Sequence, residues 1–597
     1  MPVSALSNSN GVVSCTVSCN GSPISAEIKI VSVEIIKSVN RISTAVLVIG
    51  DGDMPSGSFP VSDTDTFKPG TEIEIQLGYS QQTNSVFTGV ITKHSVKIMG
   101  PDQARLVVEC KDPAIAMTVA RKNANFFNKS DKDVFQALIG EYTALRAKIS
   151  FDSATKHTSL VQFNVSDWDF MITRAEANGL LVSVDAGVVN IAAPSAAKEA
   201  ALKVTYGIDL IDFSADLDAR YQYSSVTACG WDLASQQIQE GSASTQALTK
   251  QGNIDGSTLA DVLGVTDYRL QSGAPQDVGF LTTWAKAQQT KSELARIRGH
   301  VSFQGSHLAK VAELIELAGV GERFNGRAFI SSVCHTFEDG NWVTRVEFGL
   351  SPNWFSEVNQ LAAPQAAGLA PGIGGLHIGL VTQLKDDPES QYKIKVSIPE
   401  MAAAEGGFWA RLSHFYGSNG VGAFFIPEIG DEVVLGFFND DPAHPVILGS
   451  LYSSKNLSPY ELTAENNTKA LVTRSKMKIE FDEKKKFIRL LTPGNNIITI
   501  SDDDKAITLE DQNQNKLTLD SNGITLDSPK DIKLSAKGKI TLNAVNNIEA
   551  TANADIKHTG LNISHTANLG FTAKASATAE VSASGTTTVK GSLVMIN

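Results

Sequence analysis

Alternating apolar and polar positions dominate the first 110 residues of the chain. Runs rich in β-branched residues are separated by short clusters of Gly, Pro and Asp, a pattern that is typical of strands joined by turns. Pro69 and Gly70 form a turn signal directly before one such run. We therefore predict strands over residues 28–37, 43–49, 71–77, 86–98 and 104–110.

A helical interval follows these strands. Ser130 and Asp133 are placed to cap one helix, and Gly179 is placed to end another. From about residue 180 to residue 350 we expect strands again, with a polar stretch near 233–275. The residues that share one face are Val134, Ala137, Leu138 and Ile139 in the first helix, and Trp168, Met171, Ile172 and Ala175 in the second.

The C-terminal tail carries the clearest internal repeat. Isoleucine recurs every eight residues, and leucine stands two residues after each of the first three isoleucines. A single chain of this kind would have an open strand edge and too little apolar surface per turn. We predict that three chains wind around one axis; a single-chain solenoid or an ordinary sheet is the alternative. The expected inward core is Ile524, Leu526, Ile532, Leu534, Ile540, Leu542, Ile548 and Ile556.

Composition narrows the class of protein. The 597 residues include 51 Lys and Arg against 64 Asp and Glu, a net charge of −13, which argues against a nucleic-acid-coating role. Aromatic residues make up only 7% of the chain, so an interior of Ile, Val, Leu and Ala suits β-structure. The five scattered cysteines predict no disulfide framework. No apolar run is long enough for a membrane-spanning helix, and the first residues resemble no secretion signal, so we expect cytoplasmic synthesis.

The most specific motif lies in residues 421–455. Pro427, Gly430 and Asp431 belong to a tight turn that leads into a strand, and an Asp441-Pro442 turn joins that strand to the next, which contains Gly449. This block closely resembles the OB-fold core of VgrG-type spike proteins, which belong to bacterial contractile injection systems and contractile phage tails. Segments 111–127, 165–182 and 319–350 resemble the hub region of the same family.

The resemblance implies a mainly β homotrimer. Its hub, expected over residues 1–355, would hold two β-barrel modules similar to the inner-tube protein, together with some helices. An Ala-, Pro- and Gly-rich linker is expected over 356–375, and an OB-fold domain over 376–455. Residues 456–597 would form an intertwined triple-stranded β-helix, or β-prism, which we call the needle.

The resemblance also implies a mechanical function. Such a spike seats the sixfold inner tube on a threefold hub and pierces the target envelope when the sheath contracts. The implied partners are an Hcp-like inner tube or tube-initiator ring, baseplate proteins, transiently the target membrane, and no nucleic acid. A conical PAAR-type tip protein would cap the apolar end formed by Leu593, Val594, Met595 and Ile596.

Several kinds of machine use such spikes. We expect an extracellular phage-tail-like particle first, type VI secretion second and a phage tail third, with assembly in the bacterial cytoplasm before the particle is released or fired. An enzyme-bearing spike and a trimeric adhesin or tail fibre are the alternatives from other functional classes.

We expect no catalytic, cofactor or metal site. About 20 residues separate the OB block from the first needle-like strand, which is too few for an inserted enzyme, and the chain stops after the needle. The aspartates at 386–387 and 502–504 fit solvated turns, and Cys15 and Cys19 lack a nearby His. Glycine-rich segments 319–322 and 372–375 open no βαβ unit, which argues against nucleotide binding. His558 and His565 could bind an axial ion in a trimer or could face outward.

Overall fold

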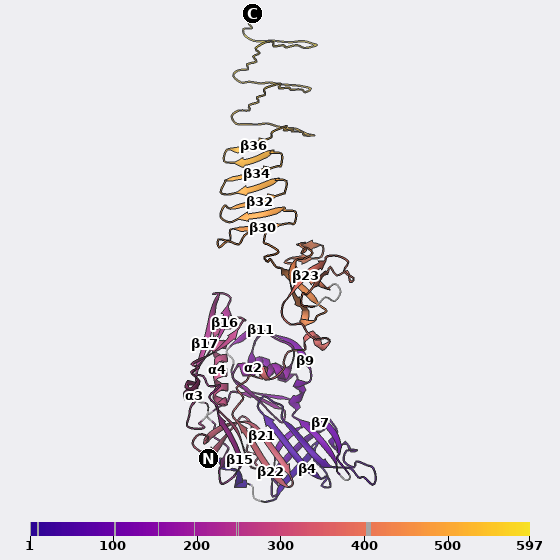
Figure 1. Cartoon of the computed structure of the whole chain (residues 1–597), viewed down its shortest axis with the longest axis vertical. Coiled ribbons are helices and arrows are strands. Elements are labelled where there is room, and N and C mark those ends of the chain that lie inside the picture. The colour runs from indigo at the N-terminus through magenta and orange to yellow at the C-terminus, as the bar shows by residue number, and fades with distance from the viewer. Residues whose placement is uncertain are drawn as a thin grey trace. The chain divides into compact units, whose positions relative to one another are not determined.

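The computed structural model describes residues 2–8, 11–100, 103–152, 155–195, 198–245, 248, 250–401 and 407–596 (Figure 1). The chain divides into two compact units, Met1–Leu451 and Tyr452–Asn597. Strands predominate in both units, in agreement with the predicted mainly β fold class. In the part of the chain that is described, no helix is long and apolar enough to cross a membrane.

The larger unit is organised around one 14-stranded sheet. Its N-terminal half confirms the strands predicted up to residue 110, with shifts of a few residues at their ends. The two halves join where β4 and β21 pair in antiparallel register, with Glu34 opposite Thr336. The strands are β1 (Val3–Ser4), β2 (Val13–Cys19), β3 (Ser22–Pro23), β4 (Ile30–Ser38), β5 (Thr44–Gly50), β6 (Glu72–Tyr79), β7 (Gln82–Ile98), β8 (Ala104–Lys111), β14 (Leu202–Thr205), β15 (Leu210–Leu217), β19 (Ile297–Gln304), β20 (Leu314–Ala318), β21 (Gly326–Glu338) and β22 (Asn341–Phe348).

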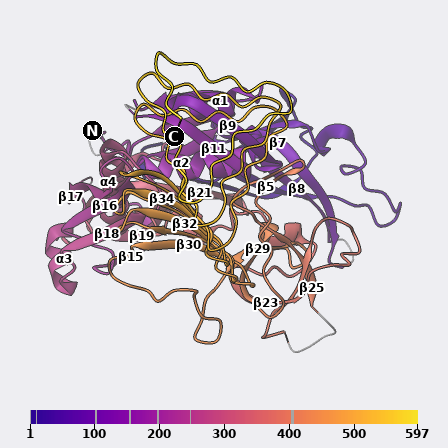
Figure 2. The ribbon, with the colours of Figure 1, turned by 90° about the horizontal axis from the view of Figure 1, so that it is seen from above.

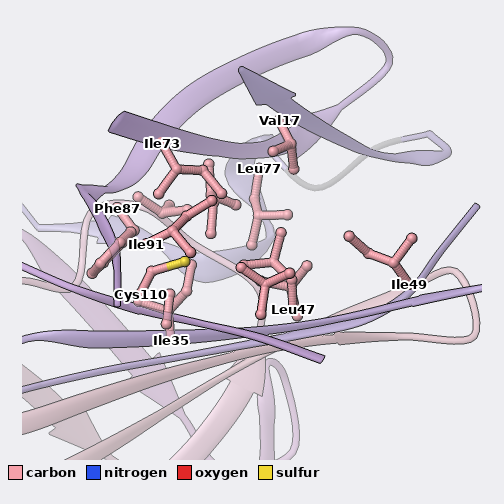
Figure 3. Close-up of a cluster of buried hydrophobic side chains, with 14 of the residues drawn as sticks. Val17, Ile35, Leu47, Ile49, Ile73, Leu77, Phe87, Ile91 and Cys110 are labelled. Atoms are coloured by element: carbon pink, nitrogen blue, oxygen red, sulfur yellow. The ribbon is translucent and has the colours of Figure 1, made fainter. Parts of the chain in front are cut away.

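Each half of this sheet has its own hydrophobic core. Under the N-terminal half, Leu47, Ile73 and Leu77 are fully buried with their neighbours (Figure 3). Under the C-terminal half, Val301 and Phe303 belong to a separate cluster. The hub thus has one continuous sheet with a separate core under each half, and the two barrel modules that the resemblance implies stay a prediction.

Along the chain, two helices and two small sheets lie between β8 and β14. Helix α1 (Asp131–Gly140) begins with the predicted capping box, in which the Asp133 amide donates to Ser130 Oγ at 3.2 Å. Helix α2 (Asp167–Ala177) ends just before Gly179, whose φ of +70° suits glycine. Both predicted helices are confirmed. The strands beside them are β9 (Arg121–Ser130) paired with β11 (Lys156–Ser166), and β10 (Arg146–Ser150), β13 (Val188–Ala192) and β12 (Leu181–Asp185).

Strands return between residues 180 and 350, as expected, but the interval also contains two helices that were not predicted. Helix α4 (Val278–Ala295) crosses this interval, with Asp277 accepting from the Phe280 amide at its start. Its buried side includes Gln288, Gln289 and Lys291, so it carries no long apolar stripe for a periodicity argument to detect. The stretch near 233–275 that looked merely polar contains a second helix, α3 (Gly256–Leu263), and the strands β17 (Gln237–Ser244) and β18 (Asp267–Ser272), which both pair with β16 (Ser225–Asp232) in a three-stranded sheet.

A closed five-stranded barrel completes the larger unit. Its interior contains Val396, Val433 and Leu435, all fully buried. The connection from the hub holds a short helix, α5 (Phe355–Val358), and a 3-10 turn, η4 (Gln365–Gly368). The barrel strands are β23 (His377–Gln383), β24 (Ile394–Ser397), β25 (Phe408–Leu412), β28 (Glu432–Phe437) and β29 (Pro445–Ser450), and a separate hairpin consists of β26 (Gly417–Ser418) and β27 (Val421–Gly422).

The smaller unit begins as a seven-stranded antiparallel meander. Each of its strands has five residues, and each pairs with the next along the chain. Beyond this meander, the described residues 528–596 form neither helix nor strand within the chain. The meander strands are β30 (Thr468–Val472), β31 (Lys478–Asp482), β32 (Phe487–Leu491), β33 (Ile497–Ser501), β34 (Ala506–Glu510), β35 (Lys516–Asp520) and β36 (Gly523–Asp527).

Candidate assembly interface

One face of the meander consists of two ladders of apolar side chains. Residues two apart on a strand share a face, and antiparallel pairing sets each of them opposite an apolar residue of the next strand. The first ladder is Leu471, Ile479, Leu490, Ile498, Leu509, Leu517 and Leu526. The second is Phe481, Ile488, Ile500, Ile507, Leu519 and Ile524.

These ladders are partly exposed to solvent in a single chain. Ile479 is 38% exposed, and Ile498 and Leu509 are each 39% exposed, because only neighbours in the same sheet cover them. A sheet with an uncovered apolar face needs a second layer. Covering the exposed part of each side chain would contribute on the order of 1 kcal/mol. The opposite face carries polar residues at the strand centres, including Thr508, Thr518 and Thr525.

The meander also contains a repeat that our sequence reasoning missed. Lys476, Asn495 and Gln514 stand nineteen residues apart, each with a φ between 63° and 69°. Each donates its amide N–H to the carbonyl three residues earlier, at 2.9 to 3.0 Å. The repeating unit of nineteen residues therefore consists of two strands and two turns. Its signal was the nineteen-residue recurrence of the strand starts Lys478, Ile497 and Lys516, which a search for an eight-residue period does not detect.

The predicted needle residues fall in two settings. Ile524 and Leu526 lie on β36 and end the two ladders. Ile532, Ile540, Ile548 and Ile556 lie beyond the last intrachain strand, and each is more than half exposed in the single chain. Leu534 and Leu542, which stand two residues after Ile532 and Ile540, are also exposed. Their burial around a common axis stays a prediction.

The C-terminal end of the needle is equally uncovered. Leu593, Val594, Met595 and Ile596 are all exposed in the single chain.

His565 stacks with Phe571 at a ring-centroid distance of 6.0 Å. Among the described residues, no three His, Cys, Asp or Glu side chains lie close enough together to hold a metal ion.

The motif residues of the barrel shape its turns. Gly430 has a φ of +91°, and its amide donates to the Val381 carbonyl at 2.8 Å. Asp431 accepts from the Glu428 amide at 2.8 Å, which closes the turn that Pro427 opens before β28. The later motif residues are Asp441, which accepts from the Ala443 amide at 2.9 Å beside Pro442, and Gly449, which pairs with Val434 at an irregularity in the register.

An aromatic hairpin on the barrel was not anticipated. Phe415 and Phe424 are 87% and 84% exposed, and they flank the short pair β26 and β27. Tyr416 and Phe425 beside them are also exposed. Four aromatic side chains in one short uncharged stretch are costly to leave in water, so this hairpin is a second uncovered surface.

Buried charges in the hub have partners that hold its elements together. Arg174 Nε donates to Asp131 Oδ1 at 2.8 Å, and His157 lies 3.0 Å from Asp131 Oδ2. Burial raises the pKa of Asp131, but the hydrogen bonds from His157 and Arg174 outweigh it and hold the pKa well below its ordinary value. Glu176 forms a buried ion pair with Lys291 at 2.9 Å.

The polar residues considered from the sequence also have structural roles. Asp387 accepts from the Gln391 and Lys393 amides at 2.6 and 3.1 Å, which closes a turn after β23. The Asp504 amide donates to Ser501 Oγ at 3.0 Å in the turn between β33 and β34. Burial raises the pKa of the Cys15 thiol to about 12 and that of Cys19 to about 11, so neither is poised as a thiolate.

Acid is expected to destabilise the hub through His335. Burial, with smaller contributions from Lys37 and His307, lowers the pKa of His335 to about 3. The unfolded chain binds this proton near pH 6.5, so the free energy of unfolding falls as pH drops below that value, by about 2 kcal/mol between pH 7 and pH 5. Replacing His335→Gln should remove this loss in denaturant titrations at the two pH values. The exposed His414→Gln serves as the control, and an unchanged loss in His335→Gln would exclude this cause.

Three family models match the chain. The Alg8 N-terminal domain matches residues 9–339, which is more than half of the chain. The type VI secretion system/phage-baseplate injector OB domain matches residues 377–452. The phage baseplate V C-terminal trimerisation domain matches residues 488–549, a range that begins within β32 and runs beyond the meander.

Curated relatives include type VI secretion system spike proteins of Pseudomonas aeruginosa. VgrG1b is 25% identical over 273 residues, covering 41% of this chain and 35% of its own length. VgrG5 is 40% identical over 63 residues, covering 11% of this chain and 8% of its own length. The chain spans about a third of the length of VgrG1b and VgrG1c.

Solved structures with a similar chain trace include a 43 kDa prophage tail protein from Shewanella oneidensis, with 10% identity and a TM-score of 0.43, covering 57% of this chain and 98% of that one. Another is an Escherichia coli type VI secretion component, with 12% identity and a TM-score of 0.36, covering 73% of this chain and 99% of that one. From the family models, the chain belongs to the Alg8 N-terminal domain family, and it is related to the VgrG-type spike proteins of contractile injection systems.

Proposed function

We propose that this chain is the structural central spike of a contractile injection machine and works as a homotrimer. The observation that carries the proposal is the pair of apolar ladders on β30–β36, which a single chain leaves uncovered. Three such sheets facing one axis would cover one another, and the octad residues from Ile532 onward would continue the same inner surface. Strands of three chains that pair with one another resist axial load, because no chain can leave alone.

The hub, residues 1–355, would seat the spike on the sixfold inner tube. The separate cores under the two halves of its sheet support two tube-like modules per chain, and three chains would then present six. An Hcp-like tube or a tube-initiator ring is the expected partner, with baseplate proteins around it. The barrel at 376–455 would carry the load from the hub to the needle at 456–597, with residues 356–375 as the linker.

The far end of the needle would hold a tip protein and meet the target membrane. Leu593, Val594, Met595 and Ile596, triplicated in the trimer, would form a blunt apolar platform. A conical PAAR-type protein is the partner that we expect there.

The spike would act mechanically and not as an enzyme. Only residues 451–467 separate β29 from β30, and they contain no helix or strand. The buried carboxylates Asp131 and Glu176 are ion-paired with Arg174 and Lys291, which suits structural roles. A peptidoglycan-release assay on the purified protein should therefore give no activity, and clear release would favour the alternative of an enzyme-bearing spike.

The machine that we favour is an extracellular phage-tail-like particle, assembled in the cytoplasm and then released, with type VI secretion as the second candidate. Particles purified from the medium of a producing culture should contain this chain at about three copies each, by quantitative mass spectrometry. Deleting its gene should abolish intact particles. Retention with a membrane-anchored complex inside cells would favour type VI secretion instead, and a chain that stays monomeric would contradict the spike itself.

A further inference from the structure

Strands β9 and β11 present an apolar and basic surface to solvent, which we call the ribbon surface. Phe127, Val161 and Phe163 are 64%, 56% and 78% exposed. The opposite face of the same pair of strands is covered, because Phe126 and Leu160 pack against the core beneath α1 and α2. The two strands contain four basic residues and no carboxylate. Lys129 and Lys156 are exposed at one end of this strand pair; Lys129 shares the face of Phe127, whereas Lys156 stands on the alternate face, with Leu160.

The hairpin between β16 and β17 presents an apolar and acidic surface, which we call the hairpin tip. Trp231 and Ile238 are cross-strand partners, 42% and 63% exposed, and Leu233 in the turn is 70% exposed. Asp232 accepts from the Ser235 amide at 2.9 Å, whereas Glu240 on β17 is already ion-paired with Arg269 of the same chain. Hydrogen bonds from Ser235 lower the pKa of Asp232, so it is charged at neutral pH.

The charge difference extends beyond these few residues. Residues 225–277, which include the hairpin tip and α3, contain six carboxylates and two basic side chains. The ribbon and the hairpin tip are therefore complementary in charge and similar in apolar character. Complementary charge steers two apolar surfaces into one register and disfavours like pairing with like.

The two surfaces lie on opposite sides of the hub. Strand β11 contacts α2 and, through His157 against Phe280, the start of α4, and α4 in turn contacts β16 and β17, so helices stand between the two surfaces. Figures 1 and 2 show β9 and β11 on one side of these helices and β17 with α3 on the other. One surface cannot reach the other within a chain, but both are free to meet a neighbouring copy.

We propose that the ribbon surface of one copy docks on the hairpin tip of the next, which closes three hubs into a ring. A head-to-tail contact between different surfaces forms a ring when its rotation closes. Phe127, Val161 and Phe163 pack against the Trp231, Leu233 and Ile238 side, with Lys129 facing Asp232. The inference rests on the proposed trimer and names the contact that joins its hubs.

Cysteine cross-linking of the full chain tests this contact. The double variant Phe163→Cys with Leu233→Cys, treated with a short bis-maleimide, should give a ladder of dimers and trimers on a denaturing gel. Each single variant and the unaltered chain, whose own five cysteines are buried or half-buried, serve as controls and should stay monomeric on the gel.

Charge reversal adds a second readout. Lys129→Glu, in the double-cysteine background, should lower the cross-linking yield several-fold, and adding Asp232→Lys should restore part of it. Lys148→Glu, an exposed reversal on β10 outside the ribbon, should leave the yield unchanged.

The mass of the assembly, measured on protein without cross-linker, distinguishes failure of the hub contact from failure of the trimer itself. A trimer that gives no ladder would overturn the hub contact and leave the trimer standing. A monomer would overturn the trimer as well. Cross-links only to a different protein of the particle would also overturn the inference, because that protein would then occupy the surface.

Discussion

Two aspartates on the apolar ladders, Ile507→Asp with Leu509→Asp on β34, are expected to convert the trimer into monomers. Both side chains lie on the uncovered face of the meander, 40% and 39% exposed in a single chain. In the trimer, six carboxylates would have to leave water without cations to pair with them, at a cost of at least about 1–3 kcal/mol each. The trimer should weaken by well over about a thousandfold, measured by sedimentation at micromolar concentration.

The same strand supplies the matched control. Thr508 stands between the two ladder residues and points to the opposite face, so Thr508→Asp should leave the trimer intact. The distal pair Ile532→Asp with Ile540→Asp should also abolish trimers if those residues point inward. A stable, assembly-competent trimer from either pair would refute the inward assignment for that part of the chain.

The second large effect is expected at the needle end. Val594→Asp with Ile596→Asp should abolish binding of a PAAR-type tip protein and leave the trimer mass unchanged. Removing two apolar side chains per chain from a contact, in three copies, should cost about 3 kcal/mol or more, which is over a hundredfold in Kd. Calorimetric titration of the purified trimer with its tip protein measures this.

Ser592→Asp, one residue before the platform, adds one negative charge per chain, against two in the double variant, without removing an apolar side chain, and it should weaken binding far less. Equal loss in both variants would mean that charge alone, and not the apolar platform, decides binding. Unchanged binding in Val594→Asp with Ile596→Asp would place the tip contact elsewhere.

Short-range patterns allowed much of the fold to be predicted. The strands before residue 110 alternate cleanly because one face of each meets a core, and α1 and α2 carry both a cap and an apolar face. Helix α4 has a cap but lacks the apolar face. Its buried Lys291 is held by Glu176 of another helix, so the stability of that helix face comes from tertiary partners that no local pattern contains.

The candidate interface could be predicted only in part. The eight-residue period was visible because every repeat keeps Ile at the same place through Ile556. The ladders were not visible, because their repeat spans two strands and its turns use different residues, Arg474-Ser475 in one and Pro493-Gly494 in the next. The aromatic hairpin at Phe415 and Phe424 was missed for another reason: a sequence gives apolar character but not exposure.

The change in pairing at residue 528 has a consequence for how the molecule is made. Strands β30–β36 pair along one chain and can form in microseconds, whereas the residues after them find no strand partner in their own chain. Once three meanders associate, the three tails are held at an effective concentration of about a millimolar, so winding becomes a unimolecular step. Unwinding must separate all three chains, and the melting and reassembly curves of the needle should therefore show hysteresis, with a midpoint that depends on scan rate.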